Sequence, residues 1–229
     1  EGSGLTASGN YALTSVQAAG NATALTITPR VITINAYAKV RNYGDANPAL
    51  NYWIGGQGLA NGNTLSGVLA TSATTTSSVG AYAITQGTLA ASANYSVTYN
   101  GANLTILPRP LTVTYTAAPA SRTYGDANPT LTGSVSSAGL VGGDTLTGAA
   151  TWTTSATATS GVGSYRVTGS GLSASSNYRL SVVQAAGNAT ALTINPRAIT
   201  ITADALTRYY GSTNPALTFT VGGQGLVNG

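Results

Sequence analysis

The stretch Tyr43-Gly44-Asp45-Ala46-Asn47-Pro48 decides how the whole sequence is organised. It recurs unchanged as Tyr124-Gly125-Asp126-Ala127-Asn128-Pro129 and, altered, as Tyr210-Gly211-Ser212-Thr213-Asn214-Pro215. The spacing between copies, roughly 80 to 90 residues, is too long for one coil of a solenoid and is typical of a small β domain. The sequence therefore predicts an array of tandem modules.

A second landmark divides the array into modules. An apolar alternation ends in Pro-Arg three times, at Pro29 and Arg30, at Pro108 and Arg109, and at Pro196 and Arg197. Proline ends a strand ladder because it lacks an N–H group. We predict that residues 1–29 are the C-terminal part of one module, 30–108 and 109–196 are complete modules, and 197–229 are the N-terminal part of another.

Strand signals within a module favour an all-β fold. Apolar residues alternate with Thr or Asn after each Pro-Arg, as at Ile32 and Ile34, which is typical of a half-buried strand. A second such strand follows the Tyr-Gly turn. The Gly-rich stretches 58–65 and 139–146 have room for a single helical turn. Asn100-Gly101, between two apolar alternations, predicts a type I′ hairpin that closes the module.

Composition excludes most kinds of chemistry. Charged residues are 6% of the chain, where about 25% is usual, and there is no His, Cys or Met. Without imidazole or thiolate, and with five scattered acids, the chain lacks the usual bases, nucleophiles and metal ligands. We expect no catalytic residue, no metal, no cofactor and no enzymatic activity.

The charge and hydropathy patterns limit the kinds of partner that the chain is expected to bind. Nine basic residues are scattered singly, whereas nucleic-acid binding needs clustered Lys and Arg. No apolar run approaches the roughly 18 residues of a membrane helix. We expect neither nucleic-acid binding nor membrane insertion. The lack of an initiator Met and of a signal peptide predicts an internal piece of a longer protein.

The ordered motifs resemble the MBG repeats of the YGX type. These motifs are Y-G-D-x-N-P, G-L-x-x-G-[ND]-T-L, V-G-x-Y, N-Y and a terminal L-T-I-x-P-R, and they run through both complete and both partial modules. The repeats occur in tandem in very large secreted or surface-anchored bacterial adhesins, including filamentous-haemagglutinin-like and biofilm-matrix proteins. The resemblance implies mostly β modules of β-grasp-like or sandwich character and an extracellular or cell-surface location. Ser212 departs from the pattern, where the repeats have Asp.

The expected function is that of a structural stalk or fibre segment. No Gly/Ser linker separates the modules at Pro108 and Arg109, so neighbours should keep a near-constant angle and form an elongated rod. The expected partners are neighbouring modules of the same chain or other copies of the protein.

Two alternatives remain open. The first is a module that binds carbohydrate or a host surface, with Trp53, Trp152 or the Thr-rich stretch 151–154 contacting surface glycans. The second is a fibre subunit that polymerises by strand complementation, the tail of one chain pairing with the head of the next.

The Tyr-Gly motif itself is interpreted as a structural turn. Its glycine should need a positive φ, and its proline should hold the preceding Asn extended. Asp should be replaceable, because Ser212 occupies the third copy and Asn63 aligns with Asp144. The predicted turn residues are Tyr43, Gly44, Asp45, Pro48, Tyr124, Gly125, Asp126, Pro129, Tyr210, Gly211 and Pro215.

Aromatic residues are expected to serve mainly the core. A buried tyrosine ring whose hydroxyl bonds the backbone suits a small β module. The motif tyrosines expected there are Tyr11, Tyr43, Tyr82, Tyr95, Tyr124, Tyr165, Tyr178 and Tyr210. Both tryptophans are expected to be partly buried.

Overall fold

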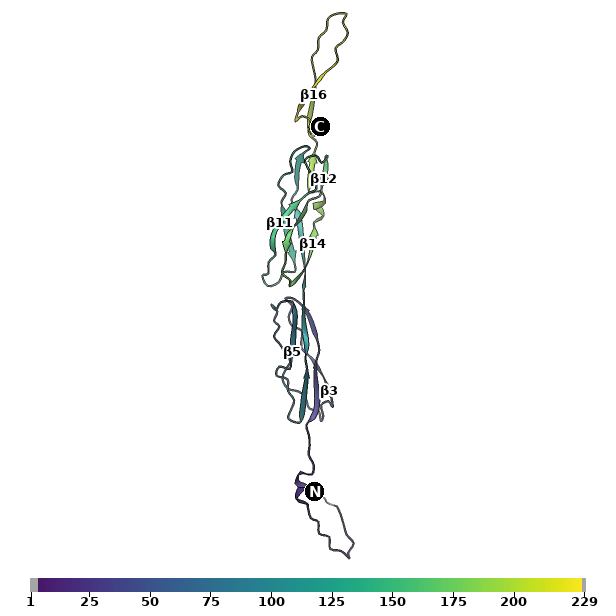
Figure 1. The fold of residues 1–229 in the computed structure, drawn as a ribbon, viewed down its shortest axis with the longest axis vertical. Coiled ribbons are helices and arrows are strands. Elements are labelled where there is room, and N and C mark those ends of the chain that lie inside the picture. The colour runs from purple at the N-terminus through teal and green to yellow at the C-terminus, as the bar shows by residue number, and fades with distance from the viewer. Residues whose placement is uncertain (1–3, 228–229) are drawn as a thin grey trace. The chain divides into compact units, whose positions relative to one another are not determined.

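The structure is a computed structural model that describes residues 4–227. It contains two compact units. The first consists of Glu1–Arg41, Ala46–Thr74 and Gly80–Ile106, and the second of Asn42–Asp45, Thr75–Val79 and Leu107–Gly229. Figure 1 labels strands β3 (Tyr52–Gly56) and β5 (Gly80–Thr85) in the first unit and β11 (Thr147–Thr153), β12 (Gly163–Tyr165) and β14 (Tyr178–Gln184) in the second.

One sheet of the first unit is built around β1 (Arg30–Ala36). This strand pairs antiparallel with β3 (Tyr52–Gly56) and parallel with β6 (Tyr95–Asn100). Ile32 and Ile34, on one face of β1, are fully buried. The alternation of Ile with Thr and Asn thus places one face in the core, as the sequence predicts.

The other sheet of the first unit has the order β2-β7-β5-β4. Its strands are β2 (Lys39–Asn42), β7 (Ala102–Leu107), β5 (Gly80–Thr85) and β4 (Ala70–Thr71). β5 and β7 are antiparallel, and Leu104, Ile106 and Ile84 on them are buried.

The predicted hairpin at Asn100-Gly101 is wrong. β6 ends at Asn100 and β7 begins at Ala102, and the two strands belong to different sheets, so the chain changes sheets at Gly101. A type I′ turn needs two residues with positive φ, and neither Asn100 nor Gly101 has one. The Tyr99 hydroxyl donates to the Ile84 carbonyl oxygen at 2.7 Å, which ties the corner to β5.

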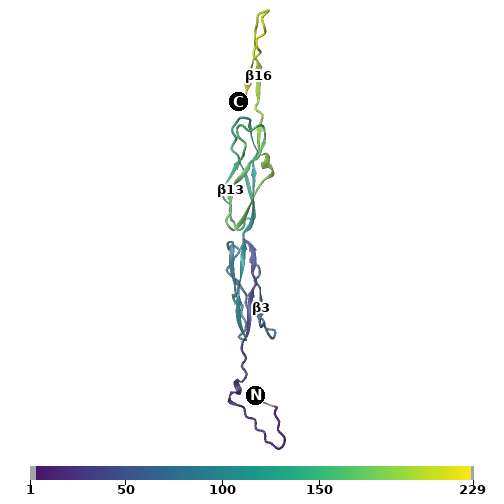
Figure 2. The same ribbon diagram turned by 45° about the vertical axis from the view of Figure 1, so that its right-hand side comes forward.

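The second unit repeats this arrangement (Figure 2). β8 (Arg109–Ala117) pairs antiparallel with β10 (Gly133–Ala138) and parallel with β14 (Tyr178–Gln184). β15 (Leu192–Asn195) pairs antiparallel with β12 (Gly163–Tyr165) and parallel with β9 (Ala120–Thr123). A separate pair is formed by β11 (Thr147–Thr153) and β13 (Thr168–Ser173).

The core of the second unit joins its sheets. Ala117 of β8 packs in one buried cluster with Val167 and with Leu192 and Ile194 of β15. Both units also pair their opening strand with a late strand in parallel, as β1 with β6 and β8 with β14. The predicted fold class, mostly β with small sheets in tandem, is confirmed.

The Gly-rich stretches form turns, so the helical turn suggested for them is wrong. Asn61 and Gly62 have φ of 56° and 72°, and Gly142 and Gly143 have φ of 61° and 85°. Helical residues need a negative φ. The short 3₁₀ helices of the described chain lie instead at η1 (Ala19–Thr23) and η2 (Ala186–Thr190), which share the sequence AGNAT.

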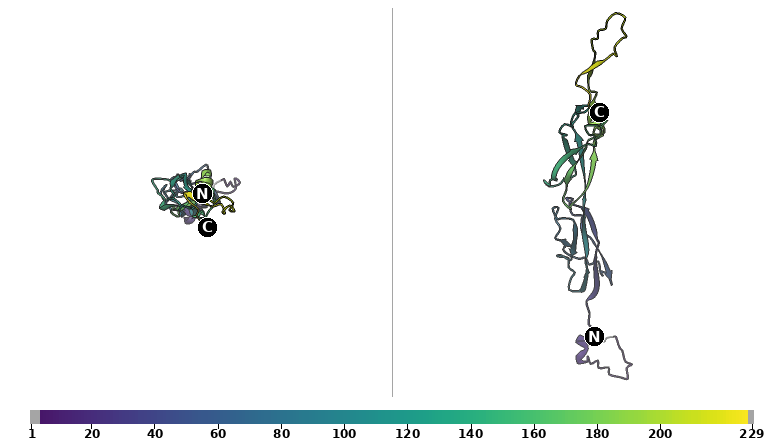
Figure 3. Two further views of the ribbon diagram at one scale, coloured as in Figure 1. Left: turned by 90° about the horizontal axis from the view of Figure 1, so that it is seen from above. Right: turned by 45° about the horizontal axis from the view of Figure 1, so that its top comes forward.

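The segments at the two ends of the described chain, residues 4–29 and 197–227, are mostly exposed to solvent. Residues 4–29 contain η1 but no strand (Figure 3). All of these residues are exposed. β16 (Ile199–Ala203) and β17 (Phe219–Gly223) pair with each other, yet Ile199 and Ile201 keep exposed side chains. Within residues 4–227, no helix is long and apolar enough to cross a membrane.

Candidate functional site

The three Tyr-Gly turns share one backbone conformation. Gly44, Gly125 and Gly211 have φ of 81°, 88° and 84°, the left-handed region that the sequence predicts. In each turn the residue after glycine donates its backbone N–H to the residue before tyrosine, at 3.2, 3.1 and 3.2 Å. The turn forms in the same way with Asp45 or with Ser212.

Tyr43 is built into the second compact unit. Its backbone N–H donates to the Leu107 carbonyl oxygen at 2.9 Å. Its ring is 8% exposed and packs edge-on against Tyr178, with ring centres 5.5 Å apart. The hydrogen bond to the Asp144 carboxylate is the main effect that raises the pKa of Tyr43, and burial raises it further.

Tyr178 and Asp144, which both contact Tyr43, are also bonded to each other. The Tyr178 hydroxyl donates to Asp144 Oδ2 at 2.7 Å and accepts from the Val141 backbone N–H at 3.0 Å. Burial is the main effect that raises the pKa of Tyr178, and the hydrogen bond to Asp144 raises it further. Both phenols are therefore held in the neutral form and orient one carboxylate.

Arg109 binds the rest of the turn. Its Nη1 donates to Asp45 Oδ1 at 2.7 Å and to the Tyr43 carbonyl oxygen at 3.1 Å. The sequence suggested that Asp45 acts only as a turn former, whereas the structure gives it a cationic partner. Both side chains are partly exposed, at 32% and 44%, so solvent weakens the attraction.

Shape complements these polar contacts. A Cβ atom added at Gly44 would lie 2.5 Å from Val141 Cγ1. Beside the turn, Asn177 Oδ1 accepts the Val79 backbone N–H at 3.0 Å. We call the surface formed by Arg109, Val141, Asp144, Asn177 and Tyr178 the turn receptor.

The second Tyr-Gly turn repeats the arginine contact. Arg197 Nη1 donates to Asp126 Oδ1 at 3.1 Å and to the Tyr124 carbonyl oxygen at 3.3 Å. Val227 lies where Val141 does, directly over Gly125. In the third turn, Tyr210 is fully exposed and the described chain places nothing within 4 Å of a Cβ at Gly211.

The sequence interpretation missed a buried arginine two residues before each of the first two turns. Arg41 and Arg122 are each 6% exposed. Arg41 Nε donates to Asn47 Oδ1 at 2.8 Å, and Asn47 Nδ2 donates to the Ala73 carbonyl oxygen at 2.6 Å. In the second copy, Arg122 Nε donates to Asn128 Oδ1 and Asn128 Nδ2 donates to the Ala156 carbonyl oxygen. The constant Arg-x-Tyr-Gly-x-x-Asn spacing was the available signal.

The remaining predicted residues have mixed environments. Pro48 and Pro129 are half-buried and Pro215 is exposed. At the Pro-Arg landmarks, Pro29, Arg30, Pro108 and Pro196 are exposed. Among residues 4–227, no group of three acidic side chains could hold a metal ion.

The aromatic residues depart in part from their expected core role. Among the motif tyrosines, Tyr43 and Tyr178 are buried, whereas Tyr11 and Tyr210 are exposed, so the core expectation is wrong for the latter two. Tyr82, Tyr95, Tyr124 and Tyr165 are half-buried. Trp152 packs edge-on against Tyr115, but Trp53 is 49% exposed.

Comparison with known families accounts for the recurring turn. The family model of the MBG domain, YGX type, matches residues 32–105 and again residues 113–188. The chain belongs to the MBG domain family. MBG domains are structural, adhesin-type modules of surface proteins, and the family is not a known enzyme family. No curated protein and no solved structure matches the chain.

Proposed function

We propose that these MBG repeats form a structural stalk or fibre segment of a large extracellular bacterial adhesin or biofilm-matrix protein, and that they have no enzymatic activity. The occurrence of MBG domains in surface proteins supports the location. The observation that carries the proposal is the binding of Tyr43, from the predicted module 30–108, to Tyr178 and Arg109 of the predicted module 109–196. We call these two modules the first and the second repeat.

The contacts of Tyr43 are suited to a mechanical role. A stalk must resist bending where one repeat follows another, so it needs contacts that fix orientation as well as a covalent link. Arg109 supplies a bond to Asp45 and a bond to a backbone carbonyl, and Tyr178 supplies a ring contact. A planar guanidinium with several directed donors fixes geometry better than a lysine would.

Spin labels test whether the two repeats keep a constant orientation. The chain has no cysteine, so Thr98→Cys with Ser181→Cys, both at exposed strand positions, places one label in each repeat. We expect one narrow distance distribution from pulsed electron paramagnetic resonance. Labels at Thr85→Cys and Thr98→Cys, within the first repeat, give the reference width.

Arg109→Ala should broaden only the distribution measured between the repeats. A between-repeat distribution that is already broad in the parent chain, while the reference pair is narrow, would contradict the rigid stalk.

Glycan binding is a second candidate because Trp53 is half-exposed on β3. Sugar rings stack on exposed aromatic faces. Trp152 does not offer such a face as freely, since its ring packs against Tyr115 at 5.7 Å. A glycan array with the parent chain and with Trp53→Ala tests this. Reproducible binding that disappears in the variant would support a binding module over a purely structural stalk.

A further inference from the structure

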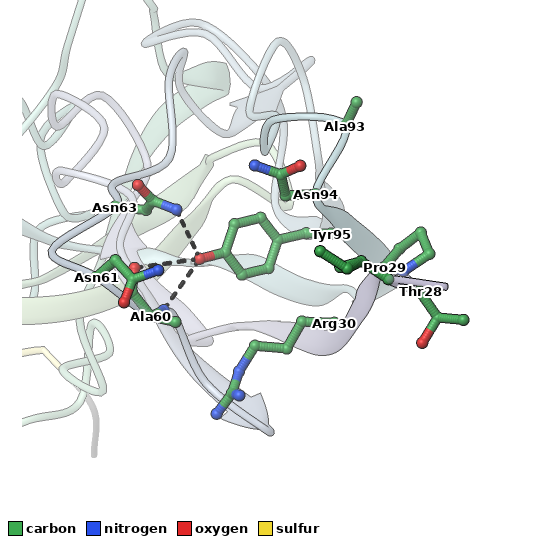
Figure 4. A pocket seen from close by; sticks show the side chains of 10 residues that line it. Thr28, Pro29, Arg30, Ala60, Asn61, Asn63, Ala93, Asn94 and Tyr95 are labelled. Atoms are coloured by element: carbon green, nitrogen blue, oxygen red, sulfur yellow. Dashed lines mark hydrogen bonds between the residues drawn. The ribbon is translucent and has the colours of Figure 1, made fainter. Parts of the chain in front are cut away.

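A hollow of about 380 Å³ lies in the first unit beside the Pro29-Arg30 landmark. Figure 4 shows the Tyr95 ring at its centre, with Asn63 and Ala60 at the hydroxyl end and Arg30 alongside. Asn94 adds a polar side chain to its lining. No Tyr-Gly turn of residues 4–227 lines it.

The hollow has the composition of the turn receptor. In the alignment of the repeats, Arg30, Ala60, Asn63, Asn94 and Tyr95 occupy the positions of the receptor residues Arg109, Val141, Asp144, Asn177 and Tyr178. Tyr95 also repeats the hydroxyl contact of Tyr178. It accepts the Ala60 backbone N–H at 3.0 Å, as Tyr178 accepts that of Val141.

Arg30 is held in the orientation that binds a turn elsewhere. Arg197 uses Nε to hold the carbonyl oxygens of Gln224 and Gly225, which leaves Nη1 for Asp126. Arg30 Nε holds Gln57 and Gly58 in the same way, at 3.1 and 2.8 Å. Its Nη1 has no hydrogen-bond partner within residues 4–227.

Charge decides which turn suits the hollow. The receptor of the second repeat carries Arg109 and Asp144, and it binds an Asp-bearing turn. Asn63 replaces that second carboxylate in the hollow, so the Arg30 cation is not offset there. A turn with a carboxylate at its third position would neutralise Arg30.

We propose that this hollow binds the Tyr-Gly-Asp turn of another MBG module, with Arg30 Nη1 donating to the turn carboxylate and the Tyr95 ring packing against the turn tyrosine. This is a binding activity of one unit, and it does not depend on the chain being a stalk. The occupant is a separate module because the Tyr43 and Tyr124 turns are already bound by Arg109 and Arg197.

The chain itself supplies a probe. Its Tyr210 turn is exposed and already has the bound conformation, with Gly211 at φ of 84° and the Ser212 N–H donating to Tyr209 at 3.2 Å. Ser212→Asp converts it into a Tyr-Gly-Asp turn. A donor chain carries Ser212→Asp and Ala60→Glu, so that it presents the turn but its own hollow is blocked. An acceptor chain carries Tyr210→Ala, so that it can only accept.

The experiment titrates the unlabelled donor into the ¹⁵N-labelled acceptor. We expect saturable chemical-shift changes centred on Arg30, Asn63 and Tyr95. A donor that keeps Ser212 should bind about 1.5- to 5-fold more weakly, the range that an exposed ion pair supplies. A donor with Tyr210→Ala should give no shifts at these residues.

Acceptor variants locate the binding surface. Ala60→Glu in the acceptor should abolish the shifts, because it places a carboxylate in the hollow. Arg30→Ala should weaken binding more than the Ser212 donor does, because it also removes a bond to the turn's backbone carbonyl oxygen, as Arg109 makes to Tyr43. Lys39→Ala, which removes a charge away from the hollow, should leave the shifts unchanged. Spectral dispersion reports whether each acceptor is folded, and the two pocket variants make the test independent of either one. Absence of saturable shifts at millimolar donor, or equal shifts from the Tyr210→Ala donor, would overturn the proposal.

Discussion

Gly44 and Gly211 have nearly the same φ but different neighbours. A Cβ at Gly44 would collide with Val141, whereas a Cβ at Gly211 meets nothing within 4 Å in the described chain. Replacing either glycine by another residue strains the backbone. Only the replacement of Gly44 also creates a steric clash, with Val141, so the two positions separate the two effects.

Gly44→Ala should destabilise the second unit by about 2 to 4 kcal/mol, because left-handed strain of about 1 to 2 kcal/mol adds to displacement of Val141. Gly211→Ala, the matched control, should cost only the strain. Differential scanning calorimetry of both variants measures the difference. Equal melting shifts in the two variants would mean that the Val141 contact contributes nothing.

Asn188 is a second residue whose contribution to the free energy of unfolding depends on its surroundings. It is 1% exposed, its Oδ1 accepts the Ala117 N–H at 2.8 Å, and its Nδ2 donates to the Tyr115 carbonyl oxygen at 3.0 Å. Asn188→Ala leaves the Ala117 N–H unpaired in the core, whereas the Tyr115 carbonyl oxygen keeps the Ala185 N–H at 2.9 Å. The variant should cost about 1 to 3 kcal/mol. Urea unfolding checks this value.

Asn21 is the matched control for Asn188, because it occupies the same place in the exposed AGNAT copy. Asn21→Ala should change the free energy of unfolding by less than about 0.5 kcal/mol. A large effect there would show that residues 4–29 are packed against the rest of the chain.

At the level of elements, the turn after β2 is held by two sets of bonds. Arg109 and Asp45 form a partly exposed ion pair, whereas Arg41 is buried and its charge must be compensated by Asn47 and by backbone carbonyls. A buried guanidinium that loses an acceptor pays a full desolvation penalty. An exposed pair loses little when one partner is removed.

Within the six-residue motif, Asn47 should therefore matter more than Asp45. Asn47→Ala should cost about 1 to 2 kcal/mol, because Arg41 Nε and the Ala73 carbonyl oxygen lose their partner. Asp45→Ser should cost less than about 1 kcal/mol. Thermal unfolding at low and high salt distinguishes them, since only the Asp45 effect should fade with salt. The reverse ranking would refute this assignment.

For the whole molecule, the composition sets the response to pH. The chain has no His and no Cys, so no side chain has an ordinary pKa between about 5 and 8, and stability should be flat across that range. Tyr43 and Tyr178 have raised pKa values, through Asp144 and through burial respectively. The folded state thus holds their protons more tightly than the unfolded state.

Stability from these two tyrosines should be complete below about pH 10, the ordinary tyrosine pKa, and should fall as the pH rises through their folded pKa values. Urea unfolding at pH 8 and pH 11 measures the loss, and Tyr178→Phe should reduce it. Tyr95 is the contrasting control, because hydrogen bonding to Ala60 lowers its pKa and reverses the sign. An unchanged alkaline loss in Tyr178→Phe would contradict this account.

The sequence by itself determined the repeats, the all-β class and the turn conformation. These follow from local rules. Alternation of apolar and polar residues specifies a strand face. A Tyr-Gly-x-x-Asn-Pro segment specifies its own turn, because φ is nearly the same at the half-buried Gly44 and at the exposed Gly211. Family membership follows from the same recurring letters.

Only the tertiary structure decided what those elements contact. Asn100-Gly101 has the letters of a hairpin, yet the burial of Leu104 and Ile106 in the other sheet prevails over the local turn preference. Arg109 lies 64 residues from its partner Asp45, and no local pattern encodes such a pairing. Tyr43 and Tyr210 share a motif but differ in burial, because burial depends on which distant surface receives the ring.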